Sequence, residues 1–339
     1  MSGIAPQILE LVIKLVAVLV LVPVAGLVLG YTELKVMAHM QSRLGPMEAG
    51  KFHGWAQLIA DGLKFLQKED VIPDAADKPV FRLAPAVVLV STFLLLVVIP
   101  FGPDSRLWIE NLEVGLFYAL AVGALSVLGV LMAGWSSNNK YSLIGGLRAA
   151  AQLIAYELPL VLSAVAVAIQ AQSLSLVDIV QAQANFKVLG VPVPYVVPQF
   201  LGFVIFVTAS VSELSRTPFD MPIAESELVT GPYTEYTGFR FLFFFLAEYG
   251  GMFALSAIAA TLYLGGYWVP GVPDNLAPVV GPLALFAKIG FVAFIMMWIR
   301  STFPRMRADQ LQELAWKYLI PLSLVNILLV GTGVALSAN

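Results

Sequence analysis

Eight apolar stretches of about 20 residues divide the chain, and this pattern restricts its fold more than any other feature. They cover Leu9–Tyr31, Leu83–Ile99, Leu116–Trp135, Leu147–Ile169, Tyr195–Val211, Phe239–Tyr263, Leu283–Ile299 and Tyr318–Leu336. The runs are continuously apolar and lack the alternation of a barrel strand, whereas helices satisfy their own backbone hydrogen bonds in lipid. The sequence therefore predicts an all-α polytopic membrane protein. We expect one integral membrane domain over residues 1–339, a bundle of about eight transmembrane helices.

The composition excludes several classes of protein. Of the 339 residues, 59% are hydrophobic and 12% are charged, whereas about 25% of a soluble domain is charged, so a soluble enzyme is excluded. The net charge is −3 with both signs scattered, which leaves no basic face for nucleic acid. Cysteine is absent and both histidines lie in one polar segment, so no ligand set for a thiolate zinc site, an iron–sulfur cluster or a haem is evident. We expect no metal or cofactor on this chain.

The distribution of positive charge predicts an orientation. Most Lys and Arg residues lie in or beside the loops that follow the first, third, fifth and seventh apolar runs. By the positive-inside rule those loops are cytoplasmic, which with eight spans places both termini on the outer side. The first run is too long for a signal peptide, so we expect a retained span. Lys14 and Lys288 lie within runs, near their outer ends, and are expected to snorkel.

The first cytoplasmic loop carries an amphipathic pattern. Apolar residues recur there at steps of three and four positions, at Phe52, Trp55, Ile59, Leu63 and Leu66. This spacing predicts an interfacial helix over about 50–68 that lies in the headgroup plane. Such a helix either only rests at the membrane surface or forms one wall of an entrance for a lipid-soluble substrate.

Two acidic residues lie deep inside apolar runs. Glu157 and Glu248 fall near the middle of the fourth and sixth runs, where an ionised carboxylate is costly. Burial disfavours the charged form, so an acid that faces the bundle interior could exchange a proton near neutral pH, as a proton relay requires. A protonated acid that only donates a hydrogen bond between helices is the alternative. Pro159 and the pair Gly250-Gly251 predict that both helices are locally broken and hydrated, which favours the relay.

The third cytoplasmic loop, about 212–238, is acidic. Residues 212–236 read SELSRTPFDMPIAESELVTGPYTEY, and they carry Glu213, Asp220, Glu225, Glu227 and Glu235 against Arg216, with Arg240 following. Its three prolines predict an irregular backbone. Clustered carboxylates repel one another and shift their titration when a nearby charge changes, which is the behaviour of a switch. A solvated acidic loop without such a role is the alternative.

In five motifs that extend over most of its length, the chain resembles the quinone-site membrane subunits of respiratory complex I, known in bacteria as the H subunits. One motif is the acidic loop quoted above. The others are QSRLGP at Gln41–Pro46, ADGLKFLQKED at Ala60–Asp70, GWSSNNKYSLIGGLRAAAQLIAYELPL at Gly134–Leu160 and WIRSTFPRMRADQLQELAWKYLIPL at Trp298–Leu322. The family usually has Glu-Arg-Lys where this chain has Glu33-Leu34-Lys35, so a charge pair made by that arginine is not expected here.

The resemblance implies a subunit of a proton-translocating NADH:quinone oxidoreductase in a bacterial inner (plasma) membrane, with quinone as substrate. Its implied partners are the other membrane-arm subunits and the peripheral-arm subunits, which would carry FMN and iron–sulfur clusters. By motif, the residues implied for the quinone chamber are Gln41, Arg43, Arg216, Asp220, Glu225, Glu227 and Arg300. Those implied for the proton path are Glu157, Glu213, Glu235 and Glu248.

Two alternative functions remain at this point. A related subunit of a ferredoxin- or F420-dependent dehydrogenase, or of an energy-converting hydrogenase, would share the same bundle with a different electron-transfer module. A stand-alone cation or proton transporter would also use acids buried in the membrane.

Overall fold

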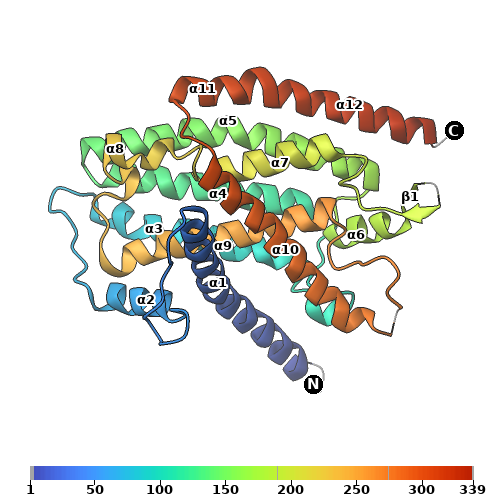
Figure 1. The fold of residues 1–339 in the computed structure, drawn as a ribbon, viewed down its shortest axis with the longest axis horizontal. Coiled ribbons are helices and arrows are strands. Elements are labelled where there is room, and N and C mark those ends of the chain that lie inside the picture. Colours follow the sequence, from blue (N-terminus) through green and yellow to red (C-terminus); the bar gives the residue numbers. More distant parts are fainter. Residues whose placement is uncertain (1–3, 189, 274, 338–339) are drawn as a thin grey trace.

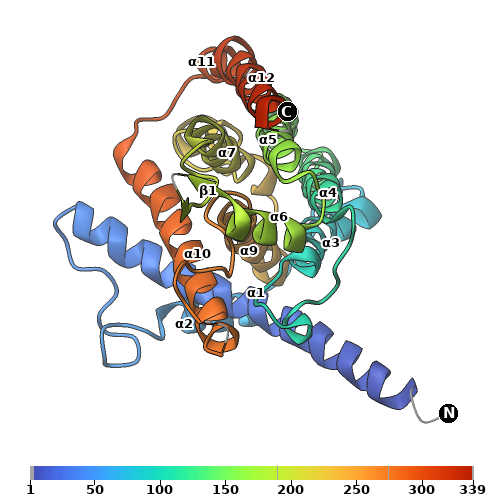
Figure 2. The same ribbon diagram turned by 90° about the vertical axis from the view of Figure 1, so that its right-hand side faces the viewer.

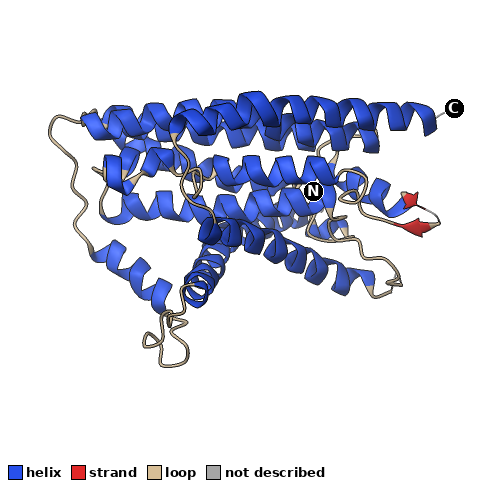
Figure 3. Cartoon of the chain, turned by 45° about the horizontal axis from the view of Figure 1, so that its top comes forward, coloured by secondary structure: helices blue, strands red, loops and turns tan. Residues whose placement is uncertain are grey.

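The computed structural model describes residues 4–188, 190–273 and 275–337. Most of this part of the chain is helical (Figure 3). Its α-helices are α1 (Ile4–Met40), α2 (Gln57–Gln67), α3 (Lys78–Leu95), α4 (Gly115–Ser136), α5 (Lys140–Ala171), α6 (Leu176–Asn185), α7 (Phe200–Glu213), α8 (Glu225–Leu228), α9 (Gly238–Tyr263), α10 (Ala277–Thr302), α11 (Ala308–Glu313) and α12 (Ile320–Ser337). The π-helical segment Leu314–Leu319 joins α11 to α12. Short 3-10 helices cover Leu96–Val98, Ser105–Leu107, Met221–Ile223 and Gly231–Tyr233, and β1 (Lys187–Val188) pairs antiparallel with β2 (Val191–Pro192).

Seven helical segments in the described ranges are long and apolar enough to cross a membrane. They are α1, α3, α4, α5, α9, α10 and the continuous helix Ala308–Leu336. The one remaining expected span, the fifth, Tyr195–Val211, corresponds to α7, which has only 14 residues. It is shorter because residues 195–199 form turns after Pro194, and the helix begins at Phe200. The prediction of an all-α polytopic membrane protein is confirmed.

The central helix of the bundle is α9. It packs against α1, α3, α7 and α10, and most of its apolar stretch is buried. In the view along the bundle, α9 lies near the centre, whereas α12 lies outside, next to α5 (Figure 2). The helices α1 and α10 cross the others obliquely (Figure 1). Side chains on α9 are therefore placed to contact several helices at once.

The predicted breaks at Pro159 and Gly250-Gly251 are wrong, because α5 and α9 are continuous helices there. The glycine has a packing role instead. A Cβ added at Gly250 would lie 2.7 Å from Cγ2 of Thr92 on α3 and 2.9 Å from Cγ1 of Val22 on α1. The absent side chain thus lets α1 and α3 approach α9 closely.

The amphipathic segment is shorter than the expected range of about 50–68. Its helix, α2, begins only at Gln57, because residues 50–56 form bends and turns with positive φ at Gly50, Lys51, His53 and Gly54. The helix packs against α1 and α9, with Leu58 buried. Three of its large apolar residues, Ile59, Leu63 and Leu66, remain exposed on the surface of the bundle.

We expect Gly250→Ala to destabilise the bundle, because the new methyl group would overlap Thr92 and Val22. Overpacking of this kind costs about 1–3 kcal/mol. The measurement is the thermal unfolding midpoint of the purified protein in detergent. The matched control is Gly290→Ala in α10, where an added Cβ meets nothing within 4 Å. Equal midpoints for the two variants would contradict the packing role of Gly250.

Candidate functional site

A partly buried network of charges joins four parts of the bundle. Arg216, two residues beyond the C-cap of α7, is 2% exposed, and Glu33 of α1 is 3% exposed. The Nη1 atom of Arg216 lies 2.5 Å from Oε2 of Glu33, and its Nη2 atom lies 2.9 Å from Oε1 of Glu248 on α9. Arg300, near the end of α10, forms an ion pair with the other carboxylate oxygen of Glu33. We call these four residues the charge network.

Arg216 is a permanent positive charge. Burial alone lowers the pKa of its guanidinium, but the carboxylates of Glu248 and Glu33 outweigh burial and hold this pKa above its usual range. The guanidinium also lies over the ring of Tyr249, 4.6 Å from the ring centre. Its contact with Glu248 is an ion pair without hydrogen-bond geometry, and Nε has no partner among the described residues. The carboxylate of Glu248 is therefore bound less firmly than that of Glu33.

A cavity of about 300 Å³ borders the charge network, and we call it the charged cavity. Arg216, Glu248 and Arg300 line it, together with Asp220 and Arg305 from the loops. Arg305 binds Asp220 through two hydrogen bonds of 2.7 Å, from Nε to Oδ1 and from Nη2 to Oδ2. This bidentate pair fixes the loop after α10 to the loop after α7. The cavity thus has both positively and negatively charged groups on its walls.

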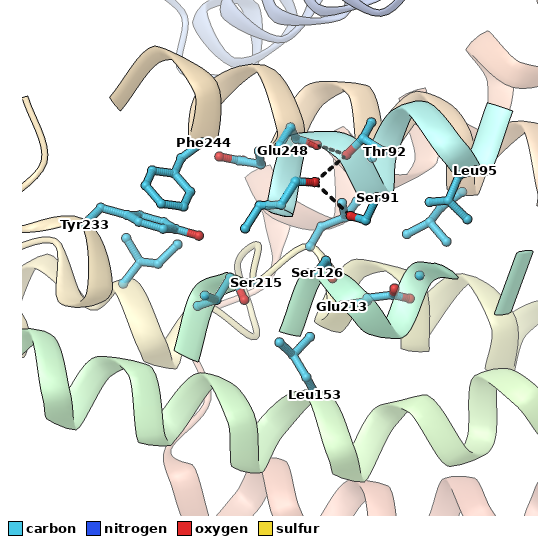
Figure 4. A pocket seen from close by; sticks show the side chains of 18 residues that line it. Ser91, Thr92, Leu95, Ser126, Leu153, Glu213, Ser215, Tyr233, Phe244 and Glu248 are labelled. Carbon is cyan, nitrogen blue, oxygen red and sulfur yellow. Dashed lines mark hydrogen bonds between the residues drawn. The ribbon is translucent and has the colours of Figure 1, made fainter. Parts of the chain in front are cut away.

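Two smaller cavities continue from the charged cavity into the bundle. The first, about 70 Å³, is lined by Glu248 and Glu213 (Figure 4) and is large enough for a few water molecules. Hydroxyl groups on its walls come from Ser91, Thr92, Ser126, Ser215 and Tyr233. The second, about 20 Å³, is lined by Glu213 and Glu157. Each cavity shares one carboxylate residue with the next, so Glu248, Glu213 and Glu157 form a series. We call them the acid series.

Glu213 ends α7 and faces α4. A Cβ added at Gly123 of α4 would lie 3.3 Å from Oε1 of Glu213. The glycine therefore leaves space for the carboxylate between the two helices. The end of α7 is held by Gln152 of α5, which is fully buried and donates hydrogen bonds to the carbonyls of Ser212 at 2.8 Å and Phe219 at 2.7 Å.

A larger apolar cavity of about 630 Å³ lies between α1, α2 and α9, and we call it the membrane-facing cavity. Its walls include Leu27, Leu63, Phe241 and Phe245. Tyr249 also lines it, and the ring of the same residue lies against Arg216. The aromatic ring is thus the boundary between the apolar cavity and the charge network.

The structure brings some of the sequence-predicted site residues together and leaves others apart. Arg216, Asp220 and Arg300 all line the charged cavity, as does Glu248 from the predicted proton path. Glu157, Glu213 and Glu248 form the acid series. Gln41 and Arg43, by contrast, are exposed beyond the end of α1, where Nε of Arg43 donates to Oε1 of Gln41 at 2.7 Å.

Glu227 and Glu235 line none of these cavities. Glu227 accepts a hydrogen bond of 2.6 Å from Arg148 on α5, and Glu235 accepts one of 2.5 Å from Asn139. Glu225 begins α8, and its side chain lies outside the described residues. Clustering in the sequence therefore did not indicate which acids share a cavity.

Glu33, Tyr249 and Arg305 are members of the site that the sequence analysis did not single out. The apolar run ends at Tyr31, which makes Glu33 resemble a loop residue, but α1 continues to Met40 and carries Glu33 within the helix. The only indication in the sequence was that Glu33 belongs to Glu33-Leu34-Lys35, which stands where the family usually has Glu-Arg-Lys. With leucine at position 34, Glu33 pairs with arginines from two other parts of the chain.

The chemical capability of this site follows from its groups. Carboxylates and hydroxyls bind water and exchange protons, whereas the two arginines of the charge network attract negative charge. In the described ranges, no group of three or more His, Cys, Asp or Glu side chains is arranged to hold a metal ion. The arrangement suits the binding of a polar group in the charged cavity and the movement of protons along the acid series.

We expect Glu33→Gln to destabilise the protein strongly, because Arg216 and Arg300 would lose a shared negative partner in the interior. Removal of one partner from a buried ion pair costs about 3–5 kcal/mol. The thermal unfolding midpoint of the detergent-purified protein is the measurement. Glu10→Gln is the control in the same helix, because Glu10 pairs with Lys14 while its side chain is 58% exposed. A Glu33→Gln midpoint as high as that of the control would contradict this role for the network.

Comparison with known proteins identifies the family. The family described as NADH dehydrogenase matches residues 13–331. An H subunit of the NADH-quinone oxidoreductase of Syntrophobacter fumaroxidans, numbered 2, is 48% identical over 333 residues, which cover 96% of both chains. The H subunit of Geobacillus kaustophilus is 49% identical over 307 residues, with 88% of this chain and 86% of the relative covered. The H subunit of Bacillus thuringiensis is 48% identical over 317 residues, with 93% and 92% covered. The chain belongs to the NADH dehydrogenase family, together with the H subunits of NADH-quinone oxidoreductase.

Proposed function

We propose that this chain is the H subunit of a bacterial NADH-quinone oxidoreductase, in which it holds quinone and couples quinone reduction to proton translocation. The observation that carries this proposal is the sequence of three cavities that share Glu248 and Glu213 and extend from the charged cavity to Glu157. The names of the relatives support NADH:quinone chemistry over the ferredoxin, F420 and hydrogenase alternatives and over a stand-alone transporter.

In this proposal, quinone enters from the bilayer. The apolar walls of the membrane-facing cavity suit an isoprenoid tail, and the polar walls of the charged cavity suit a quinone headgroup. Tyr249, which contacts both regions, would lie beside the path between them. Gln41, Arg43, Glu225 and Glu227 would belong to the part of the chamber that partner subunits complete.

Electrons would come from those partners. Reduction of a quinone requires two electrons and two protons, and we assign FMN and the iron–sulfur clusters to the peripheral-arm subunits. The other membrane-arm subunits would continue the proton path. We place the protein in the bacterial plasma membrane with α2 and the acidic loop on the cytoplasmic side and both termini outside. The first turns of α1 and the last turns of α12 lie away from α2 and α8, which supports this orientation (Figure 1).

Coupling would begin at Glu248. Glu248 is the member of the charge network that also belongs to the acid series. Quinone reduction and proton uptake change the charge in the charged cavity, and in a low-dielectric interior that change acts strongly on nearby carboxylates. Glu248 would exchange its proton first, and Glu213 and Glu157 would follow through the water-sized cavities between them. We assign Glu235 to the approach to this path, beside Asn139 at the start of α5.

We expect Glu213→Gln in the assembled enzyme to lower the proton-pumping rate at least as much as the quinone-reduction rate, because glutamine cannot carry a proton between Glu248 and Glu157. The measurement is NADH-driven acidification of inverted membrane vesicles, with NADH oxidation recorded in parallel. Loss of a positioned proton-transfer group typically costs about 10²–10⁴ in rate. Glu313→Gln is the control, because Glu313 pairs with Lys317 on an exposed surface. Normal pumping and normal quinone reduction in Glu213→Gln would refute the relay.

The membrane-facing cavity leads to a separate prediction. Gly62 of α2 lines it, and an added Cβ there meets nothing within 4 Å, so we choose Gly62→Phe to place a ring at the wall of the cavity. We expect the KM for a long-tailed quinone to rise about tenfold, a loss of about 1.4 kcal/mol. The KM for a quinone with a short tail should change much less. Gly290→Phe on α10 is the control, and an equal effect of Gly62→Phe on both quinones would contradict this path.

A further inference from the structure

Lys288 is a cation inside the membrane-spanning part of α10, and it belongs to none of the cavities described above. Its ammonium donates hydrogen bonds to the carbonyl of Gly266 at 2.8 Å and to that of Trp268 at 2.6 Å. An ammonium has three donors, so these two bonds leave one donor for another group. None of the ion pairs within the described ranges involves Lys288. Its positive charge therefore has no carboxylate partner in this part of the chain.

The turn after α9 holds the ammonium in place. Gly265 and Gly266 have φ values of +80° and +53°, which strain any residue with a side chain. A Cβ at Gly266 would also lie 2.7 Å from Cγ2 of Val180 on α6. The turn is thus packed against α6, and its carbonyls have a fixed position. Lys288 is therefore held in one place next to the turn.

A cavity of about 480 Å³ lies beside this lysine. Its walls are almost entirely apolar and include Leu264, Trp268, Val269 and Phe291, with Lys288 on one side. Phe291 is 55% exposed, so the cavity lies at the surface of the bundle. It is formed by the loop after α9 and the middle of α10, in the part of the molecule away from α2 (Figure 1). The surface of the protein thus has an apolar hollow with one positive charge held at its side.

We propose that this hollow binds an anionic phospholipid, with an acyl chain against Leu264 and Phe291 and the phosphate at the ammonium of Lys288. The charge argues for this ligand, because a phosphate diester supplies the negative partner that the lysine lacks in the described part of the chain. The position of Trp268 fits as well, because tryptophan favours the headgroup level of a bilayer. A neutral apolar partner would fill the hollow but leave the ammonium uncompensated. The site is separate from the acid series and does not depend on the proposed quinone function.

Native mass spectrometry of the full-length protein, purified with its accompanying subunits, tests this proposal. After removal of lipid, the sample is titrated with phosphatidylglycerol or with phosphatidylcholine of the same acyl chains. We expect Lys288→Gln to weaken phosphatidylglycerol binding about fivefold, the effect of one lysine near an anionic lipid. Lys288→Arg should retain the binding. Lys14→Gln is the matched control, because Lys14 is also within a span but already pairs with Glu10 at 2.8 Å.

A second variant separates the apolar part of the site from the charge. Phe291→Trp adds volume at an exposed wall of the hollow, and we expect it to weaken the binding of both lipids. The proposal is overturned if Lys288→Gln binds phosphatidylglycerol as well as the unchanged protein does, or if the two lipids bind equally well. It is also overturned if a photocrosslinker at position 291 captures another protein and no lipid in the isolated assembly.

Discussion

The guanidinium of Arg216 is the group on which the arrangement of the site depends. An arginine does not lose its proton inside a protein, so its burial requires negative partners. These partners are Glu33 on α1 and Glu248 on α9, and Glu33 is shared with Arg300 on α10. One pair of buried charges thereby sets how α1, α9, α10 and the end of α7 face one another. The cavities between these helices follow from that arrangement.

The two carboxylates that bind Arg216 are not equivalent. The side chain of Glu33 is 4% exposed and is bound from both sides, whereas that of Glu248 is 32% exposed and lines two cavities. Glu33 thus holds the helices together, and Glu248 is the group free to respond to charge in the charged cavity. This division lets one network provide both rigidity and a proposed starting point for proton transfer. Arg216 keeps its positive charge and binds both carboxylates.

Tyr249 separates two environments within a short distance. On one side its ring lines an apolar cavity that suits a lipid-soluble tail, and on the other it contacts the most buried charge of the site. The proposed lipid site at Lys288 lies at the other end of the bundle and also places a cation beside an apolar hollow. In both places the cation needs a specific partner, because the hydrocarbon of a bilayer offers nothing to compensate its charge.

The sequence by itself determined the membrane class, the helical form and nearly all of the spans, because transfer of apolar residues from water to lipid depends on local composition. It also indicated Glu157, Glu213, Glu248 and Arg216 as residues of interest. Only the tertiary structure decided that Gly250 allows close packing within an unbroken helix. It also decided that α1 carries Glu33 into the core, and that Glu33 pairs with Arg216 rather than with a neighbour in sequence. Charge pairing and cavity formation depend on which faces of distant helices meet, and hydropathy along one chain does not contain that information.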